Sequence, residues 1–104
     1  MTEEFRSQCP IACTLDLIGD RWTLLVLRDL FLGKSRYDEF LESPERISTN
    51  VLADRLKRLE MHGLLEKERY GSHRNRMQYR LTAKGRSLAP LLQGMARWGL
   101  ENIE

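Results

Sequence analysis

The sequence contains few of the residues on which metal centres and most enzyme active sites depend. Its 104 residues include two cysteines, Cys9 and Cys13, and two histidines, His62 and His73. These residues lack the spacing of a zinc site, and no glycine-rich phosphate-binding loop occurs. The cysteines are four positions apart, which is poor geometry for a disulfide within one helix. We therefore expect neither an enzyme nor a bound metal or cofactor.

Long hydrophobic runs are also absent. The longest covers residues 24–27, Leu-Leu-Val-Leu, whereas a membrane-spanning helix needs about 20 apolar residues. Residues 1–6 do not lead into the apolar core of a signal peptide. Apolar residues make up 41% and charged residues 31% of the chain, as in ordinary globular domains. The composition predicts a single cytoplasmic domain with one hydrophobic core.

The net charge of +2 is unevenly distributed along the chain. Residues 66–80 have a local charge of +3, from Lys67, Arg69, Arg74, Arg76 and Arg80 against Glu66 and Glu68. The remainder of the chain is therefore close to −1. A basic segment beside a basic helix is typical of a nucleic-acid contact, although a solvated loop has the same composition.

Residues 48–63 predict one amphipathic helix. Ser48 suits the N-cap, because its hydroxyl accepts a backbone N–H of the first turn, and Gly63 suits the left-handed position after the end. Leu52, Leu56 and Leu59 have the spacing of a stripe that faces a core. The opposite side carries Asn50, Asp54, Lys57, Arg58 and Met61. Such a helix is about 22 Å long, enough to lie in a DNA major groove.

The elements around this helix have a recognisable order. We expect helices over residues 10–18, 21–32 and 37–41, the first capped by Cys9 and the second by Asp20. A very short strand lies within 33–36, and two longer strands cover 65–70 and 77–81. A final helix covers about 83–103; Thr82 caps it and Pro90 kinks it. The predicted fold is mainly α with a small β-hairpin (α+β). It is a winged helix-turn-helix with an additional dimerisation helix at each end. Within the single domain of residues 1–104, the helix-turn-helix covers about 37–62 and the wing about 65–81.

The last predicted helix has more apolar surface than a chain of this size can easily cover. Its stripe consists of Leu88, Leu91, Leu92, Met95 and Trp98. We expect this stripe to pack against a second copy of the chain, with Ile11 and Leu15 beside it. Symmetry then places two recognition helices about 34–36 Å apart, one turn of DNA. Trp22 and Trp98 are interpreted as core and dimer packing.

Several motifs in combination resemble the HxlR family of prokaryotic winged-helix transcriptional regulators, relatives of the MarR group. They are Cys9-Pro10, residues 15–28 (Leu-Asp-Leu-Ile-Gly-Asp-Arg-Trp-Thr-Leu-Leu-Val-Leu-Arg), Ile47-Ser48, Val51-Leu52, Arg55-Leu56, Leu59-Glu60, Gly63-Leu64, Tyr79, Leu81-Thr82 and Gly85. The resemblance extends from about residue 9 to residue 99. It implies a homodimer that binds a palindromic operator near a promoter. Recognition helices would enter successive major grooves, and wings would touch the flanking minor groove or backbone.

Base recognition needs outward donors and acceptors near the start of the recognition helix. Thr49 and Asn50 occupy that position, and an Asn side chain can pair with N6 and N7 of adenine. Lys57 and Arg58 are better placed for phosphates or a guanine edge. The residues predicted to contact DNA are Lys34, Arg36, Ser48, Thr49, Asn50, Lys57, Arg58, His73, Arg74 and Arg76, the last three in the wing.

Two charged residues of the recognition helix have a less direct role. Arg55 lies near the leucine stripe, so we expect it to pair with a neighbouring carboxylate. Asp54 lies on the polar face, where it would repel phosphates. It either accepts a hydrogen bond from a cytosine amino group or orients Arg58, four residues later.

The cysteines suggest a second hypothesis. A thiol at a helix N-terminus is stabilised as the thiolate, and Cys9 matches a position that some members of the HxlR family use to sense electrophiles or oxidants. Cys13 lies outside the family pattern. The more feasible oxidised form is a disulfide between subunits. The alternative is that both residues are small apolar fillers at the dimer seam.

The sequence therefore predicts a homodimeric transcriptional regulator that binds double-stranded DNA, with a redox response through Cys9 as an added hypothesis. The alternative is a protein-interaction module that keeps the fold without binding DNA. Binding to random duplex DNA across salt concentrations separates the two, because a basic DNA-binding surface loses affinity steeply as salt rises. Single-strand or RNA binding is disfavoured, since the sequence lacks an exposed aromatic platform.

Overall fold

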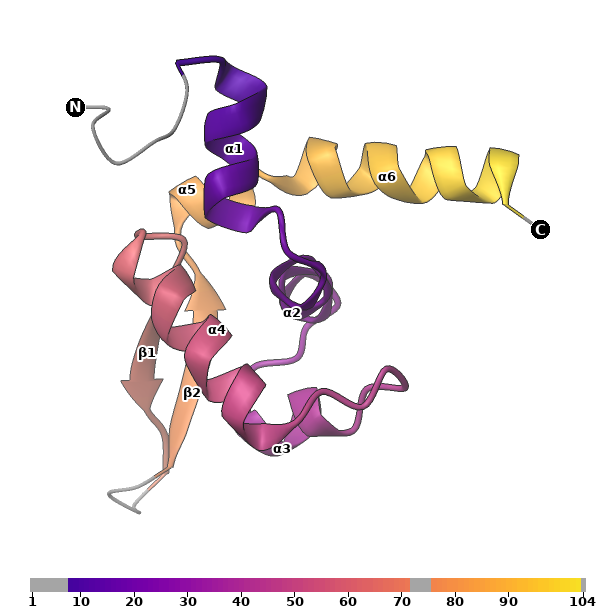
Figure 1. The fold of residues 1–104 in the computed structure, drawn as a ribbon. Helices are drawn as coiled ribbons and strands as arrows, with labels where there is room; N and C mark the ends of the chain where they lie inside the picture. Colours follow the sequence, from indigo (N-terminus) through magenta and orange to yellow (C-terminus); the bar gives the residue numbers. More distant parts are fainter. Residues whose placement is uncertain (1–7, 72–75, 104) are drawn as a thin grey trace.

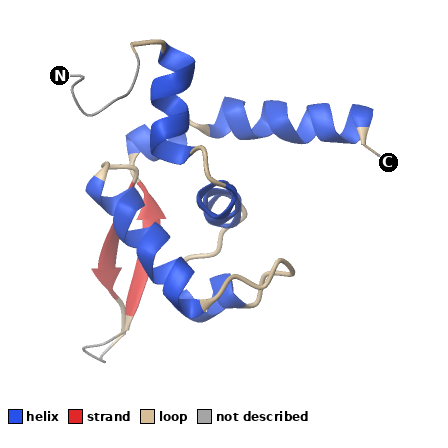
Figure 2. Cartoon of the chain, in the orientation of Figure 1, coloured by secondary structure: helices blue, strands red, loops and turns tan. Residues whose placement is uncertain are grey.

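The computed structural model of the chain describes residues 8–71 and 76–103. Its elements, in order, are α1 (Pro10–Ile18), α2 (Arg21–Phe31), α3 (Tyr37–Leu41), α4 (Thr49–Met61), β1 (Leu65–Arg69), β2 (Met77–Leu81), α5 (Ala83–Arg86) and α6 (Ala89–Asn102). Figures 1 and 2 show α2 end-on near the centre, α4 beside the hairpin, and α6 extending away from the other elements. This is the predicted mainly helical fold with a small antiparallel hairpin. Within the described residues, no helix is long and apolar enough to cross a membrane.

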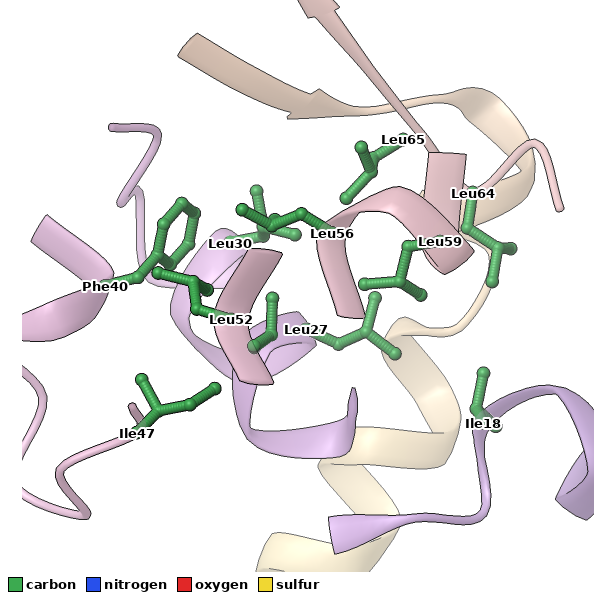
Figure 3. Packing of buried hydrophobic residues seen from close by; sticks show 11 residues of the cluster. Ile18, Leu27, Leu30, Phe40, Ile47, Leu52, Leu56, Leu59, Leu64 and Leu65 are labelled. Carbon is green, nitrogen blue, oxygen red and sulfur yellow. The ribbon is translucent and has the colours of Figure 1, made fainter. Parts of the chain in front are cut away.

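The hydrophobic core lies between α2, α4 and the start of the hairpin. Leu52, Leu56 and Leu59 are buried, as their spacing in the sequence predicted. Figure 3 shows these leucines in one cluster with Leu27 of α2, toward which Leu59 is directed. The core is completed by Ile18, Val26, Leu30, Phe40, Ile47, Leu64 and Leu65. Burying a leucine stabilises the fold by about 1.5–3 kcal/mol, so the leucine stripe holds α4 in place.

Both predicted ends of α4 are confirmed. The Ser48 hydroxyl accepts a hydrogen bond of 3.2 Å from the backbone N–H of Val51. After the last turn, Gly63 has a φ of +76°, and the N–H groups of Gly63 and Leu64 donate to the carbonyls of Glu60 and Leu59. This pair of bonds is the Schellman motif, which satisfies the carbonyls at a helix end.

The turn between α3 and α4 is fixed by contacts from both helices. The Tyr37 hydroxyl donates a 2.7 Å hydrogen bond to the carbonyl of Thr49, at the start of α4. Arg46 adopts a φ of +62°, an unusual conformation for a residue other than glycine. The chain thereby reverses direction within a few residues, and α4 starts at a defined angle to α3.

The wing is a two-stranded antiparallel hairpin in which Leu65 pairs with Leu81 and Arg69 with Met77. The expected short strand before α3 is a single bridge between Arg36 and Gln78. Beside it, the N–H of Tyr79 donates a 2.7 Å hydrogen bond to the carbonyl of Ser35. The hairpin is therefore anchored to the segment before α3.

The C-terminal region differs from the predicted single kinked helix. It forms two helices, α5 and α6, and Pro90 lies in the first turn of α6. Proline lacks an N–H and suits that turn, where no intrahelical acceptor is required. Pro90 therefore starts a new helix. Thr82 caps α5 as predicted, since its hydroxyl accepts the N–H of Gly85 at 3.0 Å.

Candidate nucleic-acid interface

The face of α4 opposite the leucine stripe is polar and exposed. Asn50 in the first turn of α4, and Lys57 and Arg58 further along, lie on this face with exposed side chains. Thr49 is exposed at the start of the helix. Ser48 is exposed as well, but its hydroxyl caps the helix. Three of the residues predicted to contact DNA thus share the polar face of α4, and Ser48 and Thr49 are exposed at its N-terminal end.

Arg55 and Asp54 of α4 belong to a chain of ion pairs. Arg55 Nε lies 2.9 Å from Asp20 Oδ2, and Arg55 Nη1 lies 2.5 Å from Asp54 Oδ2. Asp54 Oδ2 is also 3.7 Å from Arg58 Nη1. Arg55 therefore pairs with carboxylates, as predicted, and Asp54 contacts Arg58 at i+4.

Asp20 is the N-cap of α2 as well as the partner of Arg55. Its carboxylate accepts the backbone N–H groups of Trp22 and Thr23, each at 3.1 Å, and the hydroxyl of Thr23. Burial raises the pKa of Asp20, but the hydrogen bonds from Arg55, Thr23 and Trp22 outweigh this effect and lower the pKa to about 2. Asp20 is therefore a stable anion at neutral pH.

A second basic surface lies at the base of the wing. The Arg36 guanidinium lies 4.1 Å from the ring centre of Tyr70, a cation–π contact. The Tyr70 N–H donates to the carbonyl of Arg76 at 3.0 Å, and Arg36 and Arg76 are both exposed. Arg80 is held by Glu66 and Glu68 at 3.5 and 3.6 Å. His73 and Arg74, also predicted to contact DNA, lie outside the described residues.

Lys34 is placed differently from the other predicted contacts. Its ammonium donates a 2.7 Å hydrogen bond to Ser43 Oγ, and Ser43 in turn donates to the carboxylate of Asp29. Both Ser43 and Asp29 are buried. The Lys34 side chain is therefore directed into the turn between α3 and α4 and not toward the exposed face of α4.

The same network contains residues that sequence reasoning missed. Arg28 donates to Asp29 and, at 2.7 and 2.8 Å, to both carboxylate oxygens of Glu45. Arg28 lowers the pKa of Glu45 to about 2. One signal was present in the sequence: Asp29 is an acidic residue in a largely apolar helix, and a buried charge requires partners. Which partners it meets depends on the fold.

An apolar groove of about 350 Å³ runs between α1 and α6, with Ile11, Leu15, Leu91 and Met95 among its lining residues. Ile11 is 72% exposed, Leu15 58% and Trp98 61%. Leu88 and Leu92, which were predicted for the dimer face, pack partly against the chain's own core. The uncovered apolar surface is therefore formed by the outer residues of α1 and α6.

The predicted redox residues lie on α1. Cys9 is the N-cap and is exposed, and Cys13 is partly buried one turn later. The backbone N–H groups of Ala12 and then Ile11, in the first turn, lower the pKa of the Cys9 thiol. This is the effect expected for a thiol at a helix N-terminus.

A family model described as HxlR-like helix-turn-helix matches residues 17–104. The chain belongs to this family. Among curated relatives of this HxlR-type protein, the HTH-type transcriptional regulator sll1512 of Synechocystis is 38% identical over 92% of this chain and 71% of its own length. YdeP of Bacillus subtilis, also an HTH-type transcriptional regulator, is 36% identical over 88% and 71%.

Solved structures agree with this assignment. The redox regulator HypR in its reduced form superposes with a TM-score of 0.81 at 33% identity, covering 89% of this chain and 92% of HypR. The reduced transcriptional regulator YodB of Bacillus subtilis gives a TM-score of 0.75 at 32% identity, covering 94% and 97%. The family and these relatives are transcriptional regulators, not enzymes. The HxlR-type chain is therefore a helix-turn-helix transcriptional regulator.

Proposed function

We propose that this HxlR-type regulator acts in the cytoplasm as a homodimer that binds a palindromic operator in double-stranded DNA through α4. The observation that supports this most directly is the division of α4 into two faces. Its leucines are buried, while Asn50, Lys57 and Arg58 are exposed on the other side and Thr49 is exposed at the start of the helix. A helix presented in this way is able to enter the major groove with its first turn against the bases.

The roles along α4 follow from position and chemistry. Thr49 and Asn50, in the first turn, are assigned to base edges, since an Asn amide can both donate and accept at adenine. Lys57 and Arg58 are assigned to phosphates or to guanine. Arg36 and Arg76 at the base of the wing are assigned to the flanking backbone or minor groove, whose negative potential attracts arginine. His73 and Arg74 remain predicted wing contacts.

Salt-dependent binding to duplex DNA tests this function. Fluorescence anisotropy with a labelled random-sequence duplex should give weak binding that falls steeply between 50 and 200 mM salt, with a log–log slope of about −0.9 for each phosphate contacted. A protein-interaction module with the same fold would show no salt-dependent binding. The operator can then be selected from a random duplex library with the wild-type protein.

Dimerisation is proposed through α1 and α6. The supporting observation is the exposed apolar surface formed by Ile11, Leu15, Leu91, Met95 and Trp98. A second copy packed on this surface would remove it from water, and burial of apolar area drives most protein association. The resulting two-fold symmetry would pair the two α4 helices with two half-sites of a palindrome.

A redox response through Cys9 is a second proposal, favoured by the lowered pKa of its thiol and by the similarity to the redox regulator HypR. The thiolate is the reactive form of cysteine. Because Cys9 and Cys13 are the only cysteines in the sequence, a disulfide between subunits would join two α1 helices. Two thiols would lose two protons and two electrons to an oxidant such as diamide.

The redox proposal is tested with diamide on the DNA-bound protein. We expect wild type to form a covalent dimer on a non-reducing gel and to change its DNA affinity, with both effects reversed by dithiothreitol. Cys9→Ser should show neither effect. If Cys9→Ser responds to diamide as wild type does, sensing through Cys9 is excluded.

A further inference from the structure

We propose that Arg55 is a positioning residue of the DNA-binding face: it fixes α4 against the N-terminus of α2 through Asp20 and, through Asp54, sets the orientation of Arg58. This inference depends on the proposed function, because it concerns the specificity of DNA binding. It differs from the family expectation that the outward residues of the recognition helix select the sequence, since the Arg55 side chain is largely covered and paired with Asp20 and Asp54.

All three guanidinium nitrogens of Arg55 are occupied within the protein. Nε donates to Asp20 Oδ2 at 2.9 Å, Nη2 to Asp20 Oδ1 at 3.3 Å, and Nη1 to Asp54 Oδ2 at 2.5 Å. The side chain is 20% exposed. A guanidinium bound on three sides and largely covered has little capacity left for a phosphate. Arg55 therefore acts through its neighbours.

The Asp20 carboxylate that binds Arg55 is itself held in place by hydrogen bonds. They come from the backbone N–H groups of Trp22 and Thr23 and from the Thr23 hydroxyl, and Thr23 is itself buried. Asp20 is separated from Arg55 by 35 residues in the sequence. The bond between them thus ties the second turn of α4 to a rigid helix start and restricts rotation of α4 about its own axis.

Asp54 links Arg55 to Arg58 on the exposed face of α4. It lies between Arg55 and Arg58, with Oδ2 at 2.5 Å from Arg55 Nη1 and 3.7 Å from Arg58 Nη1. Without Arg55, the half-exposed Asp54 carboxylate would pair wholly with Arg58 and draw its guanidinium away from a guanine edge. Arg55 therefore shares Asp54 with Arg58 and leaves the Arg58 guanidinium available for base recognition.

Lysine is the informative replacement for Arg55. A lysine ammonium keeps the charge and can meet either Asp20 or Asp54, but it lacks the planar fork that binds both. Arg55→Lys should lower affinity for the selected operator about tenfold, with affinity for an unrelated duplex and the salt slope unchanged. Arg97→Lys, the same change at an exposed position of α6, is the matched control and should leave all three quantities unchanged.

Asp20→Asn tests the same link from the other side. Asparagine retains an oxygen that caps α2 but removes the charge that holds Arg55. The variant should lose operator affinity as Arg55→Lys does, and the double variant should lose less than the product of the two single losses, because both changes break one interaction. Thermal unfolding of each variant verifies that the chain is folded at the temperature of the binding measurement.

The alternative outcomes are distinct. If Arg55→Lys lowers affinity for operator and unrelated duplex alike and reduces the salt slope by about one, Arg55 contacts a phosphate directly and the proposal is wrong. If the folded variant binds the operator as wild type does, the pair is merely structural and the proposal is also wrong, while the proposed function stands. If wild type shows no salt-dependent DNA binding, the proposed function fails and this inference fails with it.

Discussion

At the scale of single residues, neighbouring polar side chains of α4 have different tasks. Arg55 and Asp54 use their charge inside the protein, in pairs that fix the helix. Asn50 and Lys57 are exposed and turned away from the leucine stripe. An exposed amide in the first turn suits base recognition, and an exposed ammonium suits a phosphate, which attracts any cation without regard to sequence.

Two substitutions should separate these tasks. Asn50→Ala should weaken operator binding by about 1–3 kcal/mol and leave binding to unrelated duplexes and the salt slope unchanged. Lys57→Ala should weaken binding to all duplexes alike and lower the salt slope by about one. Anisotropy titrations over a salt series measure both quantities. Equal losses for operator and unrelated duplex in Asn50→Ala would contradict its assignment to a base edge.

Acid should weaken the fold through two carboxylates. The pKa of Asp20 is lowered from 3.8 to about 2, and that of Glu45 from 4.5 to about 2. Because both folded values lie below the unfolded ones, the stability these groups contribute is complete above about pH 4.5 and is lost as the pH falls toward 2. Urea unfolding at pH 6, 4 and 3 should show a falling free energy of unfolding. Between pH 4 and 3, this free energy should fall less in Asp20→Asn and in Glu45→Gln than in wild type. An identical pH dependence in both variants would exclude these pairs as the cause.

At the scale of elements, the junctions decide how the wing and α5 sit on the recognition helix. Gly85 of α5 lies so close to the end of α4 that a Cβ built on it would be 2.0 Å from the carbonyl oxygen of Leu64 and 2.9 Å from Leu81 Cδ2. The same Leu64 carbonyl accepts the N–H of Thr82. The start of α5, the end of β2 and the segment after α4 thus meet at one point, and only a residue without a side chain fits there.

Alanine at this junction should be destabilising. Gly85→Ala forces backbone to move, and overpacking of this kind costs about 1–3 kcal/mol. Gly94 in α6 is the matched control, since a Cβ there meets nothing within 4 Å. Gly94→Ala should stabilise the chain by about 0.5–1 kcal/mol, because alanine is the better helix former. Urea unfolding of both variants measures the difference. A loss of stability in both variants would show that the close approach at Gly85 is not the cause.

At the scale of the whole molecule, one part of the chain packs around the hydrophobic core and the other leaves apolar side chains exposed. The core joins α2, α3, α4 and the hairpin, whereas α6 extends outward with Met95, Trp98 and Leu100 exposed (Figure 1). The proposed DNA-binding face and the exposed apolar face are formed by different elements. A second copy can therefore cover α1 and α6 without covering α4, which is what a dimer that binds two half-sites requires.

A single charge in the groove between α1 and α6 should prevent dimerisation. Wild type is expected to elute as a dimer at micromolar concentration, and Leu15→Glu as a monomer, because burial of the new carboxylate without a partner is costly. Leu32→Glu is the matched control: Leu32 is also an exposed leucine, at the end of α2 and outside this groove, so this variant should remain a dimer. Size-exclusion chromatography with light scattering measures the masses. A dimeric Leu15→Glu, or a monomeric wild type, would contradict the proposed interface.

The sequence by itself determined the features that depend on near neighbours in the chain. The N-caps Cys9, Asp20, Ser48 and Thr82, the left-handed Gly63 and the leucine stripe of α4 all have the predicted roles. These features follow from backbone hydrogen bonding and helical periodicity, which act over a few residues. The winged helix-turn-helix itself followed from the order of such elements.

Only the tertiary structure decided which partner each charged residue meets. Lys34, predicted to contact a phosphate, donates to Ser43, and Arg55, predicted to find some carboxylate, meets Asp20 across 35 residues. The separation of α5 from α6 also required the fold, since Pro90 is compatible with either a kink or a new start. A charge can pair with any opposite charge within reach of its side chain. Sequence spacing does not specify the partner. Arg55 and Asp20 meet because α2 packs against α4, and that packing is a property of the tertiary structure.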